Sequence, residues 1–321
     1  MFPETRLRRN RYDRRIRELT AESRILTDRL VMPVFIDESL KGRKGIDSMP
    51  GIYRYGMDSI GDYARHLDEL GVSAILLFGI PEDKDELGSS SYNPDGVIQK
   101  SIKILKENYS GIIITDLCMC EYTSHGHCGI IRNGVIDNDS TIEAYGKIAV
   151  TYAESGADMI APSGMMDGQV RAIRNALDTN GFQEIPIMSY SAKYASLLYG
   201  PFREAADSKP SFGDRKTHQM NPRNYREAMR EIDLDVKEGA DIVMVKPALF
   251  YLDVLTRARQ FFDLPIAAYG VSGEYSMIAN AVDKGLLQKE VIDEYIQSVF
   301  RAGADIFITY FAESYVSNVK R

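Results

Sequence analysis

The chain has 321 residues, of which 44% are hydrophobic and 26% are charged, and its formal net charge is −7. This composition is typical of a globular protein, the length suits one α/β barrel, and the negative charge argues against nucleic-acid binding as the main function. No apolar run approaches a membrane span and no signal-peptide core is present, so we expect a soluble, cytoplasmic protein with no nucleic-acid and no membrane partner.

Residues 1–28 are predicted to form an N-terminal arm, separate from one catalytic domain at 29–321. The arm is rich in arginine: Arg6, Arg8, Arg9, Arg11, Arg14, Arg15, Arg17 and Arg24. Acidic residues such as Asp13 and Glu18 are interleaved with the arginines, which argues against a transit peptide. The arm could bind nucleic acid, but an arm that wraps an acidic neighbouring subunit is favoured because the rest of the chain shows no other nucleic-acid feature.

Eight apolar runs follow the arm and alternate with helical patterns. The runs are Val31–Ile36, Val72–Ile80, Gly111–Leu117, Ala157–Ala161, Ile185–Tyr190, Ala240–Val245, Pro265–Val271 and Ala304–Phe311. The clearest helical patterns are Ser59–Leu70, Ser140–Glu154, Arg223–Glu238 and Lys289–Arg301. Strand and helix alternating eight times predict an α/β fold of the (β/α)8 TIM-barrel type. A doubly wound sheet is the alternative, but the chain has no glycine-rich phosphate-binding turn to favour it.

A weak internal repeat supports the barrel. Alternate runs are preceded by a glycine, at Gly71, Gly156, Gly239 and Gly303. Each of these glycines is expected to end a helix with a positive φ before the chain enters the next strand.

In a (β/α)8 barrel the active site lies at the carboxyl ends of the strands. The residues at these ends are Phe78, Asp116, Ser163, Tyr190 with Lys193, Lys246, Tyr269 with Ser272, and Tyr310. Two lysines, one carboxylate and several hydroxyls are therefore predicted to converge on one mouth.

Lys246 is the clearest candidate for catalysis among these residues. It follows the apolar run Ile242–Val245 and precedes Pro247, so its amine is expected at the end of a buried strand. Desolvation favours the neutral amine, which can attack a carbonyl, and Lys193 in the same mouth would act in the same direction. The alternative is that either lysine merely reaches solvent.

Three cysteines, Cys118, Cys120 and Cys128, fall within one short segment. An odd number of closely spaced cysteines favours metal ligands over a disulfide framework. Three thiolates leave one tetrahedral position open, as in a catalytic zinc site. His125 or His127 could instead complete a structural site, and three unliganded thiols remain the simplest alternative.

A long connection at the same face, Ser191–Pro222, is predicted to be a lid over the mouth. It contains Arg203, Arg215, Lys216 and Gln219. Because arginine binds carboxylates through two hydrogen bonds, a mobile basic lid suits an anionic substrate. A solvated charged loop is the alternative.

Taken together, these segments resemble the porphobilinogen synthase (5-aminolevulinate dehydratase) family of the zinc-dependent type. The matching stretches are Phe2–Arg9, Asp47–Arg54, Asp116–Gly129, Ala161–Gly168, Ser189–Tyr194 and Met244–Ala248. The resemblance implies a barrel with an N-terminal arm, a homo-octamer, and condensation of two 5-aminolevulinate molecules to porphobilinogen in heme biosynthesis.

The resemblance also implies a role for each matching residue. Lys246 and Lys193 would form Schiff bases with the first and second substrate, and Asp116 would assist proton transfer. The other implied site residues are Ser272 and Tyr310 for the first carboxylate, Arg203, Arg215 and Gln219 for the second carboxylate, and Cys118, Cys120 and Cys128 for zinc.

Two further positions carry expectations from the same resemblance. Glu231 aligns with a glutamate that helps to bind an allosteric magnesium ion, although an exposed helix glutamate is the simpler interpretation of the local sequence. Gly164 stands where many members of the family have an aspartate, so hydrogen bonding around the mouth is expected to differ.

Two alternative functions remain open. One is an aldolase-like barrel with a single Schiff-base lysine and a structural zinc. The other is a non-catalytic zinc-binding scaffold whose basic arm recruits nucleic acid or a protein partner.

Overall fold

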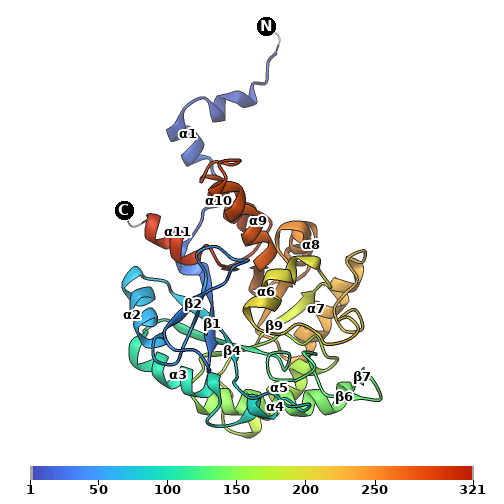
Figure 1. The fold of residues 1–321 in the computed structure, drawn as a ribbon. Helices are drawn as coiled ribbons and strands as arrows, with labels where there is room; N and C mark the ends of the chain where they lie inside the picture. Colours follow the sequence, from blue (N-terminus) through green and yellow to red (C-terminus); the bar gives the residue numbers. More distant parts are fainter. Residues whose placement is uncertain (1–2, 320–321) are drawn as a thin grey trace.

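The structure, a computed structural model, describes residues 3–319, so positions 1 and 2 of the predicted arm, including Phe2, and positions 320 and 321 lie outside it. Eight parallel strands form a barrel surrounded by helices (Figure 1). The strands are β1 (Leu30–Asp37), β4 (Ala74–Ile80), β5 (Ile112–Leu117), β8 (Met159–Pro162), β9 (Met188–Lys193), β10 (Ile242–Lys246), β11 (Ile266–Gly270) and β12 (Ile306–Thr309). Their order is β8-β5-β4-β1-β12-β11-β10-β9, and a bridge between Ile160 and Ile187 joins the two ends. The predicted (β/α)8 barrel is confirmed.

The strands are apolar on both faces because one face fills the barrel and the other packs against helices. Every residue of β1, β4, β9, β10 and β11 is buried. The barrel interior is therefore a packed core, and the space available for a ligand is at its mouth.

Helices cover the outside of the barrel and alternate with the strands. The longer ones are α2 (Ile60–Leu70), α3 (Val97–Asn108), α4 (Asn138–Glu154), α5 (Gln169–Thr179), α7 (Arg226–Glu238), α8 (Leu252–Phe261), α9 (Ser272–Asp283), α10 (Val291–Arg301) and α11 (Ala312–Val319). The repeated glycines behave as predicted, with φ values of 75° at Gly71, 100° at Gly156, 104° at Gly239 and 114° at Gly303. These conformations favour glycine and let each helix end just before a strand begins.

The smaller elements lie in the arm and in the connections. They are η1 (Leu7–Arg11), α1 (Arg14–Leu19), η2 (Thr27–Arg29), β2 (Arg43–Gly45), β3 (Tyr53–Tyr55), η3 (Ser89–Tyr92), β6 (Ile131–Arg132), β7 (Val135–Ile136), η4 (Leu197–Tyr199), α6 (Gly200–Ala205) and η5 (Leu249–Tyr251). The β2–β3 hairpin joins the edge of β1, and β6 pairs with β7. No helix between residues 3 and 319 is long and apolar enough to cross a bilayer.

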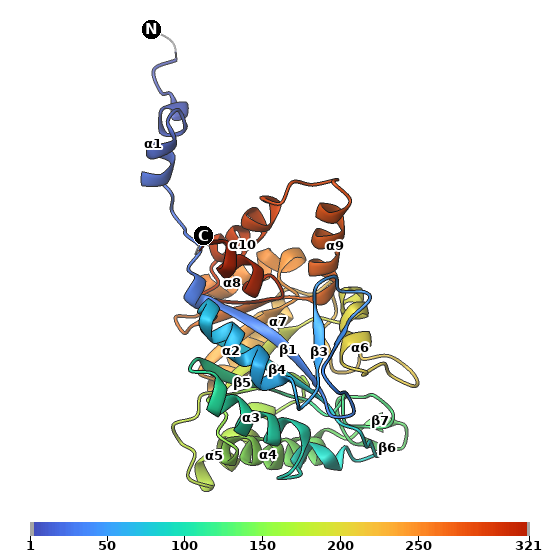
Figure 2. The same ribbon diagram turned by 60° about the vertical axis from the view of Figure 1, so that its left-hand side comes forward.

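The arm extends away from the barrel (Figures 1 and 2). No residue of η1 or α1 is buried, and Tyr12 and Leu19 are 90% and 82% exposed. The extended arm is confirmed, and its contact with another subunit stays a prediction.

One predicted strand boundary is wrong in a way that matters for the site. The apolar run predicts a fifth strand at Ile185–Tyr190, but β9 runs from Met188 to Lys193. Small polar residues at its centre hide the strand in the sequence, and Ser189 Oγ is satisfied by a 2.7 Å hydrogen bond to Asp235 Oδ2 on α7. Lys193 therefore lies on the barrel wall and not in the lid.

Candidate active site

Lys193 and Lys246 end two neighbouring strands and are paired in register across β9 and β10. Their side chains are only 6% and 5% exposed, so the alternative that they reach solvent is wrong. Lys193 Nζ donates a 2.5 Å hydrogen bond to the carbonyl oxygen of Ser163 at the end of β8. The structure thus brings both predicted lysines into one buried mouth.

Aromatic rings surround the amine of Lys246. The nitrogen lies 3.9 Å from the ring centroid of Tyr269, 4.9 Å from that of Tyr190, 5.3 Å from that of Phe202 and 5.5 Å from that of Tyr199. Burial, followed by the positive charge of Lys193, lowers the pKa of Lys246 to about 7. A substantial fraction of this amine is therefore neutral near pH 7 and able to act as a nucleophile.

Asp116 is buried near the end of β5 and faces the same mouth. Ser163 Oγ donates a 3.0 Å hydrogen bond to Asp116 Oδ2. Burial and the negative charge of Cys118 raise the pKa of Asp116 to about 6. Within residues 3–319, Asp116 Oδ1 has no hydrogen-bond partner, so one carboxylate oxygen is available to a bound molecule.

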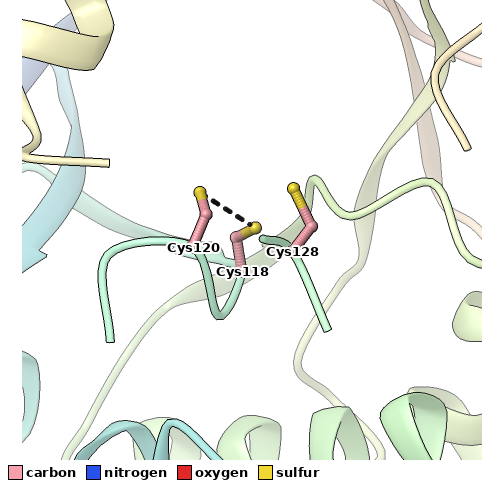
Figure 3. Close-up of side chains that lie close together, drawn as sticks. All are labelled: Cys118, Cys120 and Cys128. Carbon is pink, nitrogen blue, oxygen red and sulfur yellow. Dashed lines mark hydrogen bonds between the residues drawn. The ribbon is translucent and has the colours of Figure 1, made fainter. Parts of the chain in front are cut away.

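The three cysteines meet in one buried group beside Asp116. Their sulfur atoms all lie within 4.8 Å of one another, and Figure 3 shows them on the same side of the loop that follows β5. Cys118 Sγ and Cys120 Sγ are 3.3 Å apart. Among the residues that the structure describes, no other group of three or more histidine, cysteine or carboxylate ligands lies this close together.

The donor set fits a soft divalent cation. A hydrogen bond to Cys118 raises the pKa of Cys128 to about 12, so the three thiols cannot all ionise without a compensating positive charge. A zinc ion supplies that charge and binds thiolates in tetrahedral geometry. Three sulfurs would leave one position for another ligand.

The two neighbouring histidines do not join the cysteine group. His125 Nε2 lies 3.1 Å from the carbonyl oxygen of Glu86, and His127 Nε2 lies 3.0 Å from the carbonyl oxygen of Phe212. The alternative in which a histidine completes a structural site is therefore not the arrangement that the structure shows.

The predicted lid lies over the loop of residues 118–128 that carries the three cysteines (the cysteine loop) and donates hydrogen bonds to its main-chain carbonyl groups. The amide of Ser211 donates a 3.0 Å hydrogen bond to the carbonyl oxygen of His125. Arg215 Nη2 donates hydrogen bonds to the carbonyl oxygens of Gly126, at 2.8 Å, and Ser208, at 2.5 Å. The bonds to His125 and Gly126 hold the lid against the segment between Cys120 and Cys128, and the bond to Ser208 lies within the lid.

Three of the predicted lid residues, Arg203, Arg215 and Gln219, are turned inward, whereas Lys216 is exposed. Arg215 is 5% exposed and Gln219 is 3% exposed, whereas Arg203 is partly buried on α6. Burial alone would lower the pKa of Arg215, but the interaction with the cysteine sulfurs, led by Cys128, raises it above its ordinary value. Across the described range, Arg203 Nε, Arg215 Nε and Gln219 Nε2 have no hydrogen-bond partner, so they remain available to an anionic ligand.

Ser272 and Tyr310 follow β11 and β12, the two strands that come after β10 and its Lys246 in the barrel. The cysteine loop, by contrast, follows β5. Ser272 Oγ accepts a 2.9 Å hydrogen bond from the amide of Phe202 and thereby ties α9 to the lid. The hydroxyls of Tyr269 and Tyr310 are 3.1 Å apart. Ser272 and Tyr310 are both buried at the mouth, at 1% and 2% exposure.

Glu231 lies outside this mouth, on α7. It lines a cavity of about 430 Å³ together with Asp167, Glu227 and the lid residue Gln219. Burial, followed by the charges of Asp235 and Asp167, raises the pKa of Glu231 to about 7. The interpretation of Glu231 as an ordinary exposed glutamate is therefore wrong, and its magnesium role stays a prediction.

Three residues of the site were not predicted from the sequence. Glu121 is 3% exposed, and burial, followed by the charge of Cys118, raises its pKa to about 8. The one indication in the sequence that Glu121 belongs to the site is its position directly after Cys120. Tyr199 and Phe202 belong to the ring cage around Lys246, but they come from the lid, and nothing in the local sequence shows that the lid folds back over this amine.

Fold and site together define a (β/α)8-barrel protein whose mouth brings two buried lysines beside three cysteines that could hold a metal ion. The model of one protein family, Delta-aminolevulinic acid dehydratase, matches residues 4–318. The delta-aminolevulinic acid dehydratase of Methanothermus sociabilis is 54% identical over 318 residues, covering 99% of both chains, and that of Bacillus subtilis is 47% identical over 310 residues, covering 96% of both.

A solved structure agrees with this assignment. The delta-aminolevulinic acid dehydratase (porphobilinogen synthase) of Toxoplasma gondii, in complex with the reaction product porphobilinogen, superposes with a TM-score of 0.95. The two are 42% identical, and the match covers 98% of this chain and 91% of that one. The chain belongs to the delta-aminolevulinic acid dehydratase family.

Proposed function

We propose that this chain condenses two molecules of 5-aminolevulinate to porphobilinogen, with loss of two waters, in heme (tetrapyrrole) biosynthesis. This makes it a hydro-lyase. The observation that carries the proposal is the pair of buried lysines in register on β9 and β10, beside the three-cysteine group. The family membership and the Toxoplasma gondii relative, which binds porphobilinogen, support it.

Lys246 begins the reaction with the first substrate. Its neutral amine attacks the ketone carbon, a C–N bond forms, and the carbonyl oxygen leaves as water to give an imine. Lys193 forms the second imine in the same way. Because both ketones are held on adjacent strands, an encounter between two free molecules becomes a reaction between two positioned groups.

The remaining site residues bind the substrates and move protons. Ser272 and Tyr310 bind the first carboxylate, and Arg203, Arg215 and Gln219 bind the second one under the lid. Asp116, whose Oδ1 has no partner between residues 3 and 319, accepts a proton from substrate carbon. Cys118, Cys120 and Cys128 would hold a zinc ion, which would supply Lewis-acid polarisation of a substrate oxygen.

Borohydride trapping tests the proposal. Reduction in the presence of 5-aminolevulinate should attach the substrate irreversibly to Lys246, as a mass increase on the peptide that contains it. The variant Lys246→Met should lose this label and at least about 10³-fold in activity, as expected when a covalent nucleophile is removed. Active enzyme with an unmodified Lys246 after reduction would rule out the mechanism.

The quaternary structure belongs to the same proposal. The arm exposes Leu7, Tyr12 and Leu19, apolar side chains that a neighbouring subunit would cover. A homo-octamer held by such arms, with an allosteric magnesium ion near Glu231, is the assembly that we propose. Sedimentation of the full chain against a chain lacking residues 1–28 tests the arm, because only the full chain should form the large assembly.

A further inference from the structure

Gly164 lies directly against the phenol ring of Tyr145. A Cβ at position 164 would be 1.9 Å from Tyr145 Oη, 2.6 Å from its Cζ and 2.7 Å from its Cε2. The φ of Gly164 is outside the left-handed region, so the backbone conformation does not require glycine here. The glycine is required because Tyr145 occupies the space that a side chain would need.

Tyr145 uses that space to reach the cysteine loop. It lies on α4, is fully buried, and donates a 2.5 Å hydrogen bond from its hydroxyl to the carbonyl oxygen of Cys128. A phenol, with an ordinary pKa of about 10, carries its proton at neutral pH. Its hydroxyl is therefore a hydrogen-bond donor to this loop.

Of the three cysteines, Cys128 is the one whose position depends most on contacts made by the loop. Cys118 and Cys120 are separated by one residue at the end of β5, whereas Cys128 returns to them after the loop that carries His125 and His127. Its position relative to the other two sulfurs depends on how the main chain of that loop is held. The hydrogen bond from Tyr145 is made to the main chain at this residue.

We propose that Tyr145 is a positioning residue of the cysteine site and that Gly164 is the complementary position that admits it. The hydrogen bond fixes the main chain of Cys128, so that its sulfur faces the sulfurs of Cys118 and Cys120. Because any Cβ at position 164 collides with the phenol, a larger residue at 164 and a tyrosine at 145 exclude each other. This inference rests on the proposed metal site.

The variant Tyr145→Phe tests the hydrogen bond with almost no change of volume. Cobalt(II) is titrated into the metal-free protein against a chromophoric chelator, and the thiolate-to-cobalt charge-transfer absorption is recorded. We expect cobalt affinity to fall about 10-fold and the absorption to change, as when an outer-shell partner of a metal ligand is removed.

Tyr152→Phe is the matched control. Tyr152 is a second fully buried tyrosine on α4, but its hydroxyl lies 3.4 Å from that of Tyr122. This variant should keep the cobalt affinity and spectrum of the parent protein. If Tyr145→Phe also keeps both, or if the two variants lose affinity equally, the inference is overturned.

A double-mutant cycle tests the role of Gly164. Gly164→Ala should displace the phenol and weaken cobalt binding, whereas the same change should cost little more in a Tyr145→Leu background, where no ring is left to displace. Equal losses in both backgrounds would overturn the pairing. Parent protein without thiolate-to-cobalt absorption would overturn the metal site itself, which separates that failure from a failure of this inference alone.

Discussion

Lys193 and Lys246 are register partners on adjacent parallel strands, and both end at the mouth of the barrel. Neighbouring strands lie about 4.8 Å apart, so two charged amines at paired positions repel each other with little water to screen them. The pairing therefore adds to burial in favouring the neutral form of an amine at this position. The effect appears in the pKa of Lys246, which burial and Lys193 lower to about 7.

The first prediction concerns pH. The fraction of neutral Lys246 rises as the pH rises through about 7, so imine trapping at Lys246 should increase over this range. Lys193→Met removes a positive charge, which should raise the pKa of Lys246 and move the trapping midpoint upward by about one unit. Mass spectrometry of the trapped peptide at a series of pH values measures the midpoint without requiring turnover. An unchanged midpoint in this variant would contradict the electrostatic argument.

The second prediction concerns the metal. Chelation should reduce porphobilinogen formation by about 100-fold or more, because a Lewis acid contributes several kcal/mol to such reactions. Zinc should restore the activity, and magnesium alone should not. Cys128→Ser should require a higher zinc concentration for the same rate. Full activity in the chelated protein would instead favour an aldolase-like mechanism with a structural metal.

The third prediction concerns the lid. Arg215→Ala should raise the KM for 5-aminolevulinate roughly 10- to 100-fold, since a charged hydrogen bond contributes about 1.5–3 kcal/mol. Lys216→Ala is the control, because Lys216 is exposed and its amine lies 3.5 Å from Asp214 on the surface. Steady-state kinetics of the two variants should differ sharply. Similar KM values for both would show that the lid contributes no specific anion contact.

The fourth prediction concerns Glu231 and magnesium. The raised pKa, about 7, means that the carboxyl group loses its proton as the pH rises through that value, so activation by magnesium should be stronger above it than below. Glu231→Gln should abolish the activation at every pH. Asp233→Asn, on the same helix but paired with Lys237 at the surface, should leave it intact. Activity and particle size measured with and without magnesium check both variants.

The barrel was predictable because its signals are local. Buried parallel strands read as continuous apolar runs, and Gly71 and Gly239 mark helix ends through a backbone conformation that favours glycine. β9 departed from the pattern because Ser189 and Ser191 make its centre polar. Their burial depends on partners elsewhere in the chain, such as Asp235 on α7.

The site was predictable as a set of residue types, and its internal contacts were not. Strand ends placed Lys246 and Asp116 at one mouth, whereas the ring cage depends on the path of the lid, which brings Phe202 back over the amine. The fit between Gly164 and Tyr145 joins the end of β8 to the side of α4, and such contacts leave no mark in local sequence.

The lid makes its hydrogen bonds to the cysteine loop at one short stretch of main chain. The carbonyl groups of His125 and Gly126 accept hydrogen bonds from the lid, and the same stretch leads to Cys128, a proposed metal ligand. When the lid opens, that stretch loses contacts that restrain Cys128. We therefore expect metal exchange to be slow while the lid is closed over a ligand and faster in the free enzyme, which ties the residence time of the metal to that of the product.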